Sequence, residues 1–325
     1  MNAEILAEWL RRQGHHIVRT SSSYWYETSA RVYQAFPYHW TIEPQEKELS
    51  GLLCENKAIA LRYSTPPTAS EGKLSYHVIY EGSSFDLASL PRRARQNVRK
   101  GLRHASIEPI SLSRLATEGW NLRLETLTRQ GRARAESQAW WRQLCQSAQD
   151  LPGFEAWGAI HKEQLVASFL AFTCDSCYAL PYQQTATSHL KYRINNGLFF
   201  SVTHQVIKRH NISKVFLGLH SLDAPASVDE FKFRMGYTAQ PVRQRVVFHP
   251  RLAPVFNRFS HAVVRQLFHW YPDHPALPKI EGMLRFYLEG KRPLTEQNWP
   301  EHLTHHKKEL LKDAQSISPV CATRD

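Results

Sequence analysis

A polar loop that runs directly into a helix is the first place where this sequence can do chemistry. The stretch "SHLKYRINNGLFF" starts with charged and amide side chains and continues into apolar residues with helical spacing. Backbone N–H groups in the first turn of a helix have no intrahelical partner, and the helix dipole adds positive potential there. The loop therefore predicts an anion site, and the alternative is an ordinary helix start with a solvated lysine and arginine. Its candidate ligands are Lys191, Tyr192, Arg193, Asn195, Asn196 and Gly197.

A second charged feature is the stretch "LPRRARQNVRKGLRHASIEPI". Leu90, Ala94, Val98 and Leu102 recur every four residues, which predicts a helix with one narrow apolar edge. The rest of its surface is basic and suits an anionic partner, unless it is merely solvated. Direct DNA readout is not favoured, because neither a helix-turn-helix nor a dimerising zipper adjoins it. The candidate contacts for an anionic partner are Arg95, Arg99, Lys100 and Arg103.

The charge of the whole chain points to the same kind of partner. The 325 residues carry a formal charge of +12, which favours nucleic acid, phosphorylated cofactors or sugars, or an acidic membrane face. The length suggests about two domains, and a hydrophobic content of 42% is typical of globular proteins. Glu4 and Glu8 interrupt the apolar positions of the N-terminus, so it does not resemble a secretory signal. No segment approaches the ~20 apolar residues of a membrane span, and we expect a cytoplasmic protein.

The cysteines predict neither a disulfide scaffold nor a metal site. There are five of them, scattered along the chain. Cys174 and Cys177 form a Cys-x-x-Cys pattern, but zinc would need a second pair and redox chemistry would need a following helix. The flanking strand-like residues instead favour a β-hairpin that turns at Asp175 and Ser176.

The elements that must position these residues fall into two halves and a tail. Residues 2–12 predict a short helix, and mixed strands and one helix follow up to about residue 86. After the basic helix and a helical stretch at 111–149, "FEAWGAI", "LVASFLAFT" and "CYALPYQQ" predict three strands joined by tight turns. The polar loop and its helix come next, then the strand "KVFLGL", the helix "SVDEFKFRM" and the strand "PVRQRVVFHP". The order is β-β-β-loop-helix-β-helix-β.

That order resembles the Gcn5-related N-acyltransferase (GNAT) fold, in particular its FemAB-like and BioF2-like branch. The resemblance covers about Leu90 to His249 and rests on "LPRRARQNVRKGL", the three-strand meander, "HLKYRINNGLFF" and "FKFRMGYTAQP". It implies an α+β fold with a degenerate GNAT-like half at 1–88, a GNAT domain at 89–250 and a helical extension at 251–325. The glycine-rich Q/R-x-x-G-x-G/A loop of typical acetyl-CoA users is absent, since Gly197 stands alone.

The resemblance implies transfer of an acyl or aminoacyl group to an amine acceptor, in cell-envelope or polysaccharide metabolism. The resemblance implies acyl-CoA or aminoacyl-tRNA as the donor and a tRNA or a phosphorylated acceptor as a partner. It implies no permanently bound cofactor. The donor's phosphates would lie at Lys191 to Gly197, and backbone groups of two splayed strands would polarise the reacting carbonyl. The alternative is a non-catalytic protein that keeps the fold, has lost the donor site and binds an anionic ligand. The third hypothesis is a basic nucleic-acid-binding protein.

Three further residues are candidates for the reacting centre. Tyr178 and Tyr182 lie on the third strand of the meander and can protonate a leaving group, unless they belong to the core. Lys232 matches the lysine of a Phe-Lys pair that peptidoglycan-type members carry, where its charge would offset developing negative charge. The competing expectation is a structural ion pair between Lys232 and Asp229. His189 and His220 can act as general bases, but the chain has 17 histidines.

The residues after Arg251 resemble no known family. The stretch "RLAPVFNRFSHAVVRQLFHWYP" predicts an amphipathic helix. We expect this helix to pack against the body of the protein, and contact with a membrane surface is the alternative. The tail from residue 302 predicts a helix that frays at its end. The side chains expected to face inward are Val255, Phe259, Val263, Leu267 and Phe268.

Overall fold

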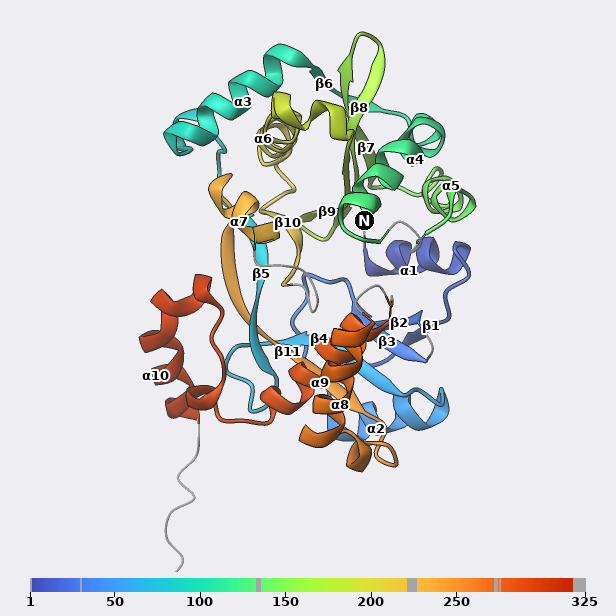
Figure 1. The fold of residues 1–325 in the computed structure, drawn as a ribbon, viewed down its shortest axis with the longest axis vertical. Helices are drawn as coiled ribbons and strands as arrows, with labels where there is room; N and C mark the ends of the chain where they lie inside the picture. Colours follow the sequence, from blue (N-terminus) through green and yellow to red (C-terminus); the bar gives the residue numbers. More distant parts are fainter. Residues whose placement is uncertain are drawn as a thin grey trace, which may run out of the picture. The chain divides into compact units, whose positions relative to one another are not determined.

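The computed structural model describes residues 2–29, 31–132, 136–220, 227–271, 274 and 276–317 (Figure 1). The chain forms two compact units made of interleaved segments. The boundaries expected at residues 88 and 250 fall inside unit 1 and unit 2, respectively. Unit 1 contains Met1–His15, Val78–Gly218 and Ala224–Thr238. Unit 2 contains His16–His77, Leu219–Asp223 and Ala239–Asp325.

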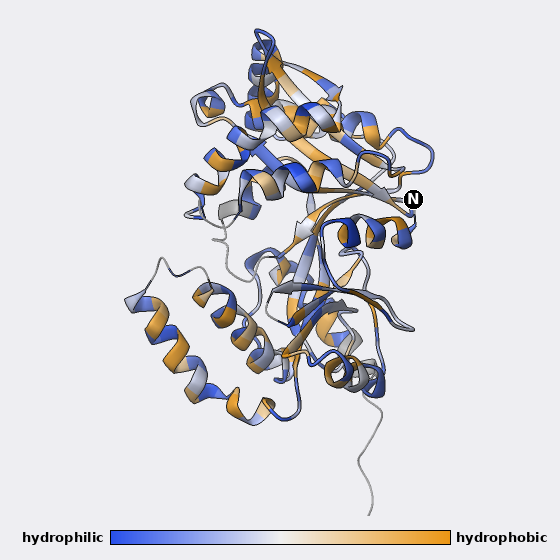
Figure 2. Ribbon diagram, turned by 90° about the vertical axis from the view of Figure 1, so that its right-hand side faces the viewer, coloured by the Kyte–Doolittle hydropathy of each residue, from blue (hydrophilic) through white to orange (hydrophobic). Residues whose placement is uncertain are grey.

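Unit 1 is built on the meander that the sequence predicts. Each of its first three strands is antiparallel to the next, and the last strand, β10, pairs with β9 in parallel. Strand β8 is buried from its second residue to its last, as expected for a continuous apolar run covered on both faces. Its hydrophobic colour is visible in Figure 2. The strands are β6 (Ser106–Ile110), β7 (Phe154–His161), β8 (Gln164–Cys174), β9 (Cys177–Thr185) and β10 (Lys214–Leu219).

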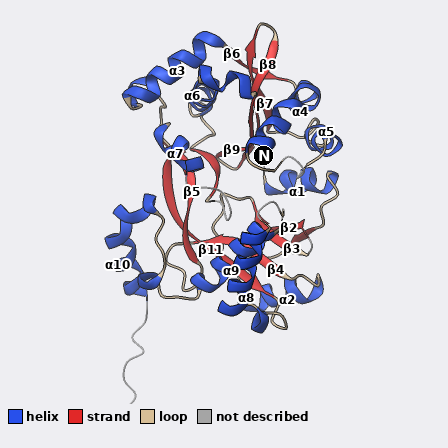
Figure 3. Cartoon of the chain, in the orientation of Figure 1, coloured by secondary structure: helices blue, strands red, loops and turns tan. Residues whose placement is uncertain are grey.

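Helices cover both faces of this meander. The central helix α6 packs on one face and α4 on the other, with α3 beside α6 and α5 beside α4 (Figure 3). Ser111 and Ser137 cap α4 and α5 by accepting hydrogen bonds from backbone N–H groups three residues ahead. Short 3-10 turns lie at Leu87–Ser89 and Thr187–Tyr192 (η2). The helices are α1 (Ala3–Arg12), α3 (Arg92–His104), α4 (Leu112–Arg129), α5 (Gln138–Gln146), α6 (Ile194–Val206) and α7 (Ser227–Arg234).

The strands of unit 2 are neighbours in the order β1-β2-β3-β4-β11. Its strands are β1 (Ile17–Arg19), β2 (Tyr24–Ser29), β3 (Val32–Phe36), β4 (Ala60–Thr65) and β11 (Thr238–Phe248). Strand β5 (Lys73–Glu81) has residues in both units. The helices are α2 (Glu46–Glu55), α8 (Arg258–Trp270), α9 (Leu277–Gly290) and α10 (Lys307–Ile317). Single 3-10 turns lie at Ala253–Val255, Leu294–Glu296 and Glu301–His306.

One arrangement occurs in both units. In unit 1 the β8–β9 hairpin is followed by α6 and by β10, which is parallel to β9. In unit 2 the β2–β3 hairpin is followed by α2 and by β4, which is parallel to β3. The chain therefore contains this β-β-α-β arrangement twice.

The hairpin at the Cys-x-x-Cys pattern forms as expected. Cys174 and Cys177 face each other across the turn between β8 and β9. Both are free thiols, and burial raises the pKa of each to about 12. A buried thiol with a raised pKa is a poor nucleophile, which fits a structural role.

The sequence prediction for the helix after Arg251 is partly wrong. Val255, Phe259 and Val263 were expected to face inward, yet 61%, 78% and 43% of their surfaces are exposed. The helix begins only at Arg258, where Asn257 and Ser260 form a capping box. Phe256 and Val264 are the residues that pack on the core of unit 2. Among the residues described, no helix is long and apolar enough to cross a bilayer.

Candidate functional site

Strands β9 and β10 pair over a short stretch and then separate. Their register runs from Cys177 opposite Lys214 to Ala179 opposite Phe216, although β9 continues to Thr185. The register between β8 and β9 shifts at the same level, between the pairs Leu170–Tyr182 and Phe172–Ala179. This shift is a β-bulge at Leu180 and Pro181. Beyond Ala179 the backbone of β9 is therefore not paired with β10, and such a gap can present donors to a carbonyl oxygen.

The polar loop lies at the end of β9 and is held by helix α4. The carboxylate of Glu125 accepts a hydrogen bond from the backbone N–H of Thr187 at 2.5 Å. The guanidinium of Arg129 donates to the Thr187 hydroxyl at 2.6 Å and to the Thr185 carbonyl at 2.8 Å. Arg193 ends the loop in the left-handed region, with φ of 64°, and is the N-cap of α6. Glu125 and Arg129 were not identified from the sequence, because no local pattern links α4 to this loop.

The structure divides the predicted loop ligands into two groups. Lys191 and Arg193 are exposed, and the Lys191 ammonium lies 5.1 Å from the centre of the Tyr192 ring. Asn195 is half-buried and accepts a hydrogen bond from the Thr185 hydroxyl. The amide of Asn196 is buried and donates to the sulfur of Met235 at 3.1 Å.

Gly197 lies inside a helix contact rather than at the loop surface. It packs against Gly101 of α3, and a Cβ atom at Gly101 would meet the Arg193 carbonyl oxygen at 2.6 Å. Only glycine permits so close an approach between two helix backbones. The first turn of α6 is therefore covered by α3, and the exposed loop residues precede it.

The basic face of α3 is free of carboxylate partners. Arg99, Lys100 and Arg103 are exposed and form no ion pair with a residue that the structure describes. Arg95 is half-buried, and its guanidinium donates to the Ala88 carbonyl at 3.0 Å. The helix thus keeps three cations available for an anionic partner.

The two candidate tyrosines have different surroundings. Tyr178 is fully buried, accepts from the Trp157 indole at 2.8 Å and donates to Glu155 at 3.0 Å. Burial, and then the Glu155 charge, raise the pKa of Tyr178 well above its ordinary value. Tyr182 is half-buried, and the Arg123 guanidinium lies 5.2 Å from the centre of its ring. Tyr178 is thus part of a satisfied core network, whereas Tyr182 keeps a partly accessible ring.

Lys232 forms the ion pair that was the competing expectation from the sequence. Its ammonium donates to the Asp229 carboxylate at 2.8 Å, and 12% and 10% of the two side chains are exposed. The neighbouring Phe231 packs edge-on against Phe199 of α6, with ring centres 5.2 Å apart. A lysine held in this way is ordered, and its charge is already partly neutralised.

The structure also assembles a histidine cluster that sequence reasoning missed. The nitrogen atoms of His104, His161 and His189 lie within 4.8 Å of one another. His161 donates from Nδ1 to the His104 carbonyl at 2.6 Å, and the buried Nε2 of His104 has no partner. The three residues lie far apart in the sequence, so no spacing signal marks them. Of these three histidines, only His189 was a candidate general base from the sequence, and the other candidate, His220, lies outside the cluster.

This cluster has the ligand types for a metal ion but not the orientation. The rings of His104 and His161 are stacked, with centres 4.0 Å apart and planes within 12° of parallel, and Tyr192 stacks on the other side of His104. An imidazole binds a metal in the plane of its ring, so one ion cannot lie in both ring planes unless a ring turns. Burial lowers the pKa of His104, and the charges of His161, His189 and two lysines lower it further. The arrangement is a ring stack beside the loop.

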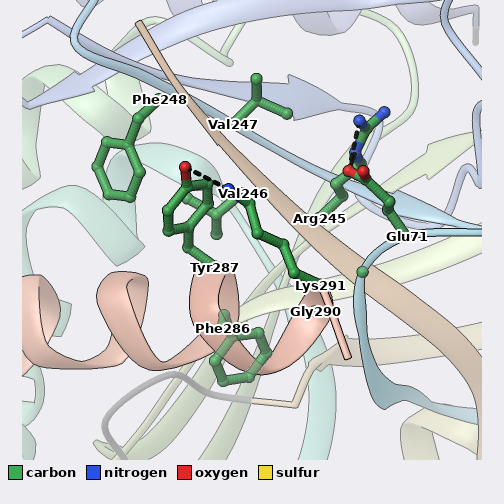
Figure 4. Close-up of a pocket in the computed structure, with 10 residues that line it drawn as sticks. Glu71, Arg245, Val246, Val247, Phe248, Phe286, Tyr287, Gly290 and Lys291 are labelled. Carbon is green, nitrogen blue, oxygen red and sulfur yellow. Dashed lines mark hydrogen bonds and ion pairs between the residues drawn. The ribbon is translucent and has the colours of Figure 1, made fainter. Parts of the chain in front are cut away.

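A pocket of about 200 Å³ lies in unit 2, between β11 and α9 (Figure 4). Arg245 and Lys291 line it, but Arg245 is paired with Glu71 and Glu46, and the Lys291 ammonium donates to the Tyr287 hydroxyl at 2.6 Å. Its cations are therefore occupied, and none of the residues predicted for the site lines it.

The comparisons with known proteins identify the fold. No family model and no curated protein matches the chain. The C-terminal domain of a lysylphosphatidylglycerol synthetase from Agrobacterium fabrum is 12% identical, with a TM-score of 0.50 over 74% of this chain and 86% of that one. FemX is 10% identical, with a TM-score of 0.50 over 77% and 93%. A tandem GNAT protein from the clavulanic acid pathway is 9% identical, with a TM-score of 0.45 over 72% and 82%.

At sequence identities this low, the structural similarity shows the fold alone. The chemistry has to be inferred from the residues of this chain. The chain therefore shares its fold with FemX and with the synthetase domain.

Proposed function

We propose that the protein transfers an acyl or aminoacyl group from an ester or thioester donor to an amine. The observation that carries this proposal is the separation of β9 and β10 at the bulge of Leu180 and Pro181. Pro181 has no backbone N–H, so Leu180 is the bulge residue that can donate to a carbonyl oxygen placed in this gap, and a donor fixed by the sheet stabilises the oxyanion of acyl transfer.

The cations around the gap support a donor with an anionic carrier. Lys191 and Arg193 are exposed on the loop after β9, and Arg99, Lys100 and Arg103 are exposed on α3, which packs beside α6. Phosphates of coenzyme A or of a tRNA backbone offer the same negative charge to these side chains. The shared chemistry is therefore a phosphate-bearing carrier with an activated acyl group.

The transfer needs an oxyanion site and two proton movements. The amine nitrogen attacks the carbonyl carbon, its proton passes to a base or to water, and the carbon–oxygen or carbon–sulfur bond to the carrier then breaks. The leaving oxygen or sulfur takes a proton, and Tyr182 is the candidate donor because its ring stays partly accessible on β9. Lys232 is a candidate for stabilising the oxyanion from its ion pair with Asp229.

The first experiment measures donor binding by isothermal titration with coenzyme A, acetyl-CoA and an aminoacyl-tRNA mixture. We expect Lys191→Glu together with Arg193→Glu to weaken binding of the true donor by more than about tenfold, because two attractive charges become repulsive. Both residues are exposed, so the melting temperature should change little. Asn196 and Gly197 are not substituted, because both are buried in helix contacts.

The control is Arg142→Glu on α5, which changes an exposed charge away from the loop. Equal loss in the control would show a general charge effect rather than a site. Binding of one donor, with transfer of its labelled acyl group to an amine, distinguishes the coenzyme from the tRNA. If none of these donors binds the unchanged protein, the proposal is wrong.

A non-catalytic protein that binds an anionic ligand is the second candidate. The observation that favours it is that helix α3 covers the first turn of α6, the turn expected to bind the donor's phosphates. Gly101 of α3 lies against Arg193, and the amide of Asn196 donates to the sulfur of Met235. This candidate predicts binding of a phosphate-bearing ligand without turnover of any acyl donor. Single-turnover assays with saturating donor therefore separate the two candidates.

A further inference from the structure

Helix α8 of unit 2 has an apolar line that faces away from the core. Phe259, Val263 and Trp270 are 78%, 43% and 63% exposed. Their spacing of four and seven residues places them within about 40° of one another around the helix. Val255 lies before the helix and Tyr271 follows its last residue, and each is 61% exposed. We call these five residues the α8 stripe.

The inner side of α8 is separately satisfied. Phe256 and Val264 pack on the core cluster that contains Val246, Phe248 and Phe286. The α8 stripe is therefore additional apolar surface and not a core face seen from outside. Phe259, Val263 and Trp270 share this side of α8 with the exposed Gln266, and an exposed phenylalanine and tryptophan on one side of a helix are uncommon on a protein without a partner there.

The surroundings of the stripe are basic. Arg251, Arg258 and Arg265 are exposed. Arg258 and Arg265 lie seven residues apart on α8, about 100° to 160° around the helix from Phe259, Val263 and Trp270, and Arg251 precedes the helix. None of them forms an ion pair within the described part of the chain. The sequence from Arg251 to Tyr271 contains no aspartate or glutamate. The partner that covers the stripe must therefore accept apolar side chains and carry negative charge beside them.

We propose that the α8 stripe docks on the surface of a bilayer that contains anionic lipid headgroups. Phe259 and Val263 enter the boundary between headgroups and acyl chains, and Arg258 and Arg265 contact lipid phosphates. Trp270 and Tyr271 lie at the end of the helix, and their amphipathic rings are of the kind that collects at membrane interfaces. The helix lies in the plane of the surface, as amphipathic helices with a basic flank do.

Two other occupants fit the chemistry less well. A second copy of the chain in a two-fold dimer would bring the same patch to itself, and this stretch contains no carboxylate that could offset the arginines. A nucleic acid would match the charge but would leave most of the apolar line against a polar backbone. A membrane surface satisfies both the charge and the apolar side chains.

The experiment is flotation of the intact protein with vesicles of phosphatidylcholine alone or with about one third phosphatidylglycerol. No acyl donor or acceptor takes part, so the result is independent of the proposed acyl transfer. We expect binding to the mixed vesicles and little to the neutral ones. Phe259→Gln with Val263→Gln should lower the partition coefficient about tenfold or more, because two side chains lose their apolar burial.

Arg258→Gln with Arg265→Gln should lower the partition coefficient about thirtyfold at low salt and much less at high salt. Two matched controls should leave binding unchanged. Leu124→Gln on α4 replaces another partly exposed apolar residue, and Arg142→Gln with Lys162→Gln removes two exposed charges elsewhere. The substituted side chains are exposed, and equal melting temperatures verify that each variant is folded.

Three results would overturn the proposal. The first is the absence of vesicle binding at low salt. The second is an equal loss of binding in the stripe variant and in its Leu124 control. The third is a dimer in sedimentation analysis that the stripe variant dissociates, with no binding to vesicles, which would assign the stripe to a second copy.

Discussion

At the scale of single residues, the ion pair of Lys232 decides how that lysine can be tested. Both partners lie on α7 and are almost entirely covered, so either charge is costly to leave alone. A lysine with a buried carboxylate partner contributes to stability whether or not it also stabilises a transition state. The two roles therefore have to be separated by changing both partners.

We predict that Lys232→Met lowers the free energy of unfolding by about 1–3 kcal/mol, because it leaves the Asp229 carboxylate without its ammonium partner. Adding Asp229→Asn should recover most of that loss, and urea denaturation measures both variants. If Lys232 acts on the oxyanion, acyl transfer stays about 10²-fold or more below the unchanged protein in the stabilised double variant. Full activity in the double variant would limit Lys232 to a structural role.

At the scale of elements, the contact of α3 with α6 depends on two glycines that face each other. Gly101 and Gly197 let the two backbones approach, and this approach fixes the basic helix against the helix that follows the loop. The sequence showed an apolar stripe on α3 that included Leu102, but Leu102 is 39% exposed and Gly101 is the buried residue beside it. A residue without a side chain leaves no mark in a hydrophobic pattern.

We predict opposite effects of one substitution at two helix-interior glycines. Gly101→Ala should destabilise unit 1 by about 1–3 kcal/mol, because the new methyl group meets a backbone oxygen that cannot turn aside. Gly51→Ala on α2 should stabilise by about 0.5–1 kcal/mol, because only the end of the Glu55 side chain lies near and alanine favours a helix. Thermal and urea unfolding give the signs. A stabilised Gly101 variant would contradict the packing described for α3.

The elements of unit 1 could be predicted from the sequence, but much of the site could not. The meander, the central helix and the hairpin at Cys174 follow from local apolar periods and turn residues. Strands β3 and β6 were missed, since each is five residues long and β6 contains a proline. The ring stack of His104 and His161 and the contact of Glu125 with Thr187 join distant segments, which no local pattern encodes. The outward face of α8 was missed because a period shows only that a helix has an apolar side.

At the scale of the whole molecule, the excess of positive charge is concentrated where it has no internal partner. Arg99, Lys100 and Arg103 on α3 are exposed and unpaired within the described residues. Their contribution to folding is accordingly small, and their contribution to the attraction of a polyanion is large.

We predict that replacing these three residues by glutamine weakens binding of a tRNA mixture and flattens its dependence on salt. Each lost phosphate contact should reduce the slope of log K against log salt by about 0.7 to 0.9. The melting temperature should stay within about 2 °C, because no ion pair is removed. Filter binding at several salt concentrations gives the slope. An unchanged slope would place the anionic partner elsewhere on the protein.

The interleaved path of the chain has a consequence for its synthesis. Helix α1 leaves the ribosome before the rest of unit 1, yet the indole of Trp9 donates to the carbonyl of Leu144, 135 residues further along the chain. The apolar face of α1 therefore stays without its partner while most of unit 1 is still being made. Strand β11 completes the strands of unit 2 only after residue 238, so unit 2 cannot finish before all of unit 1 has been translated. Nascent chains of this protein should consequently expose apolar surface for longer than chains whose domains follow one another, and should bind chaperones throughout that interval.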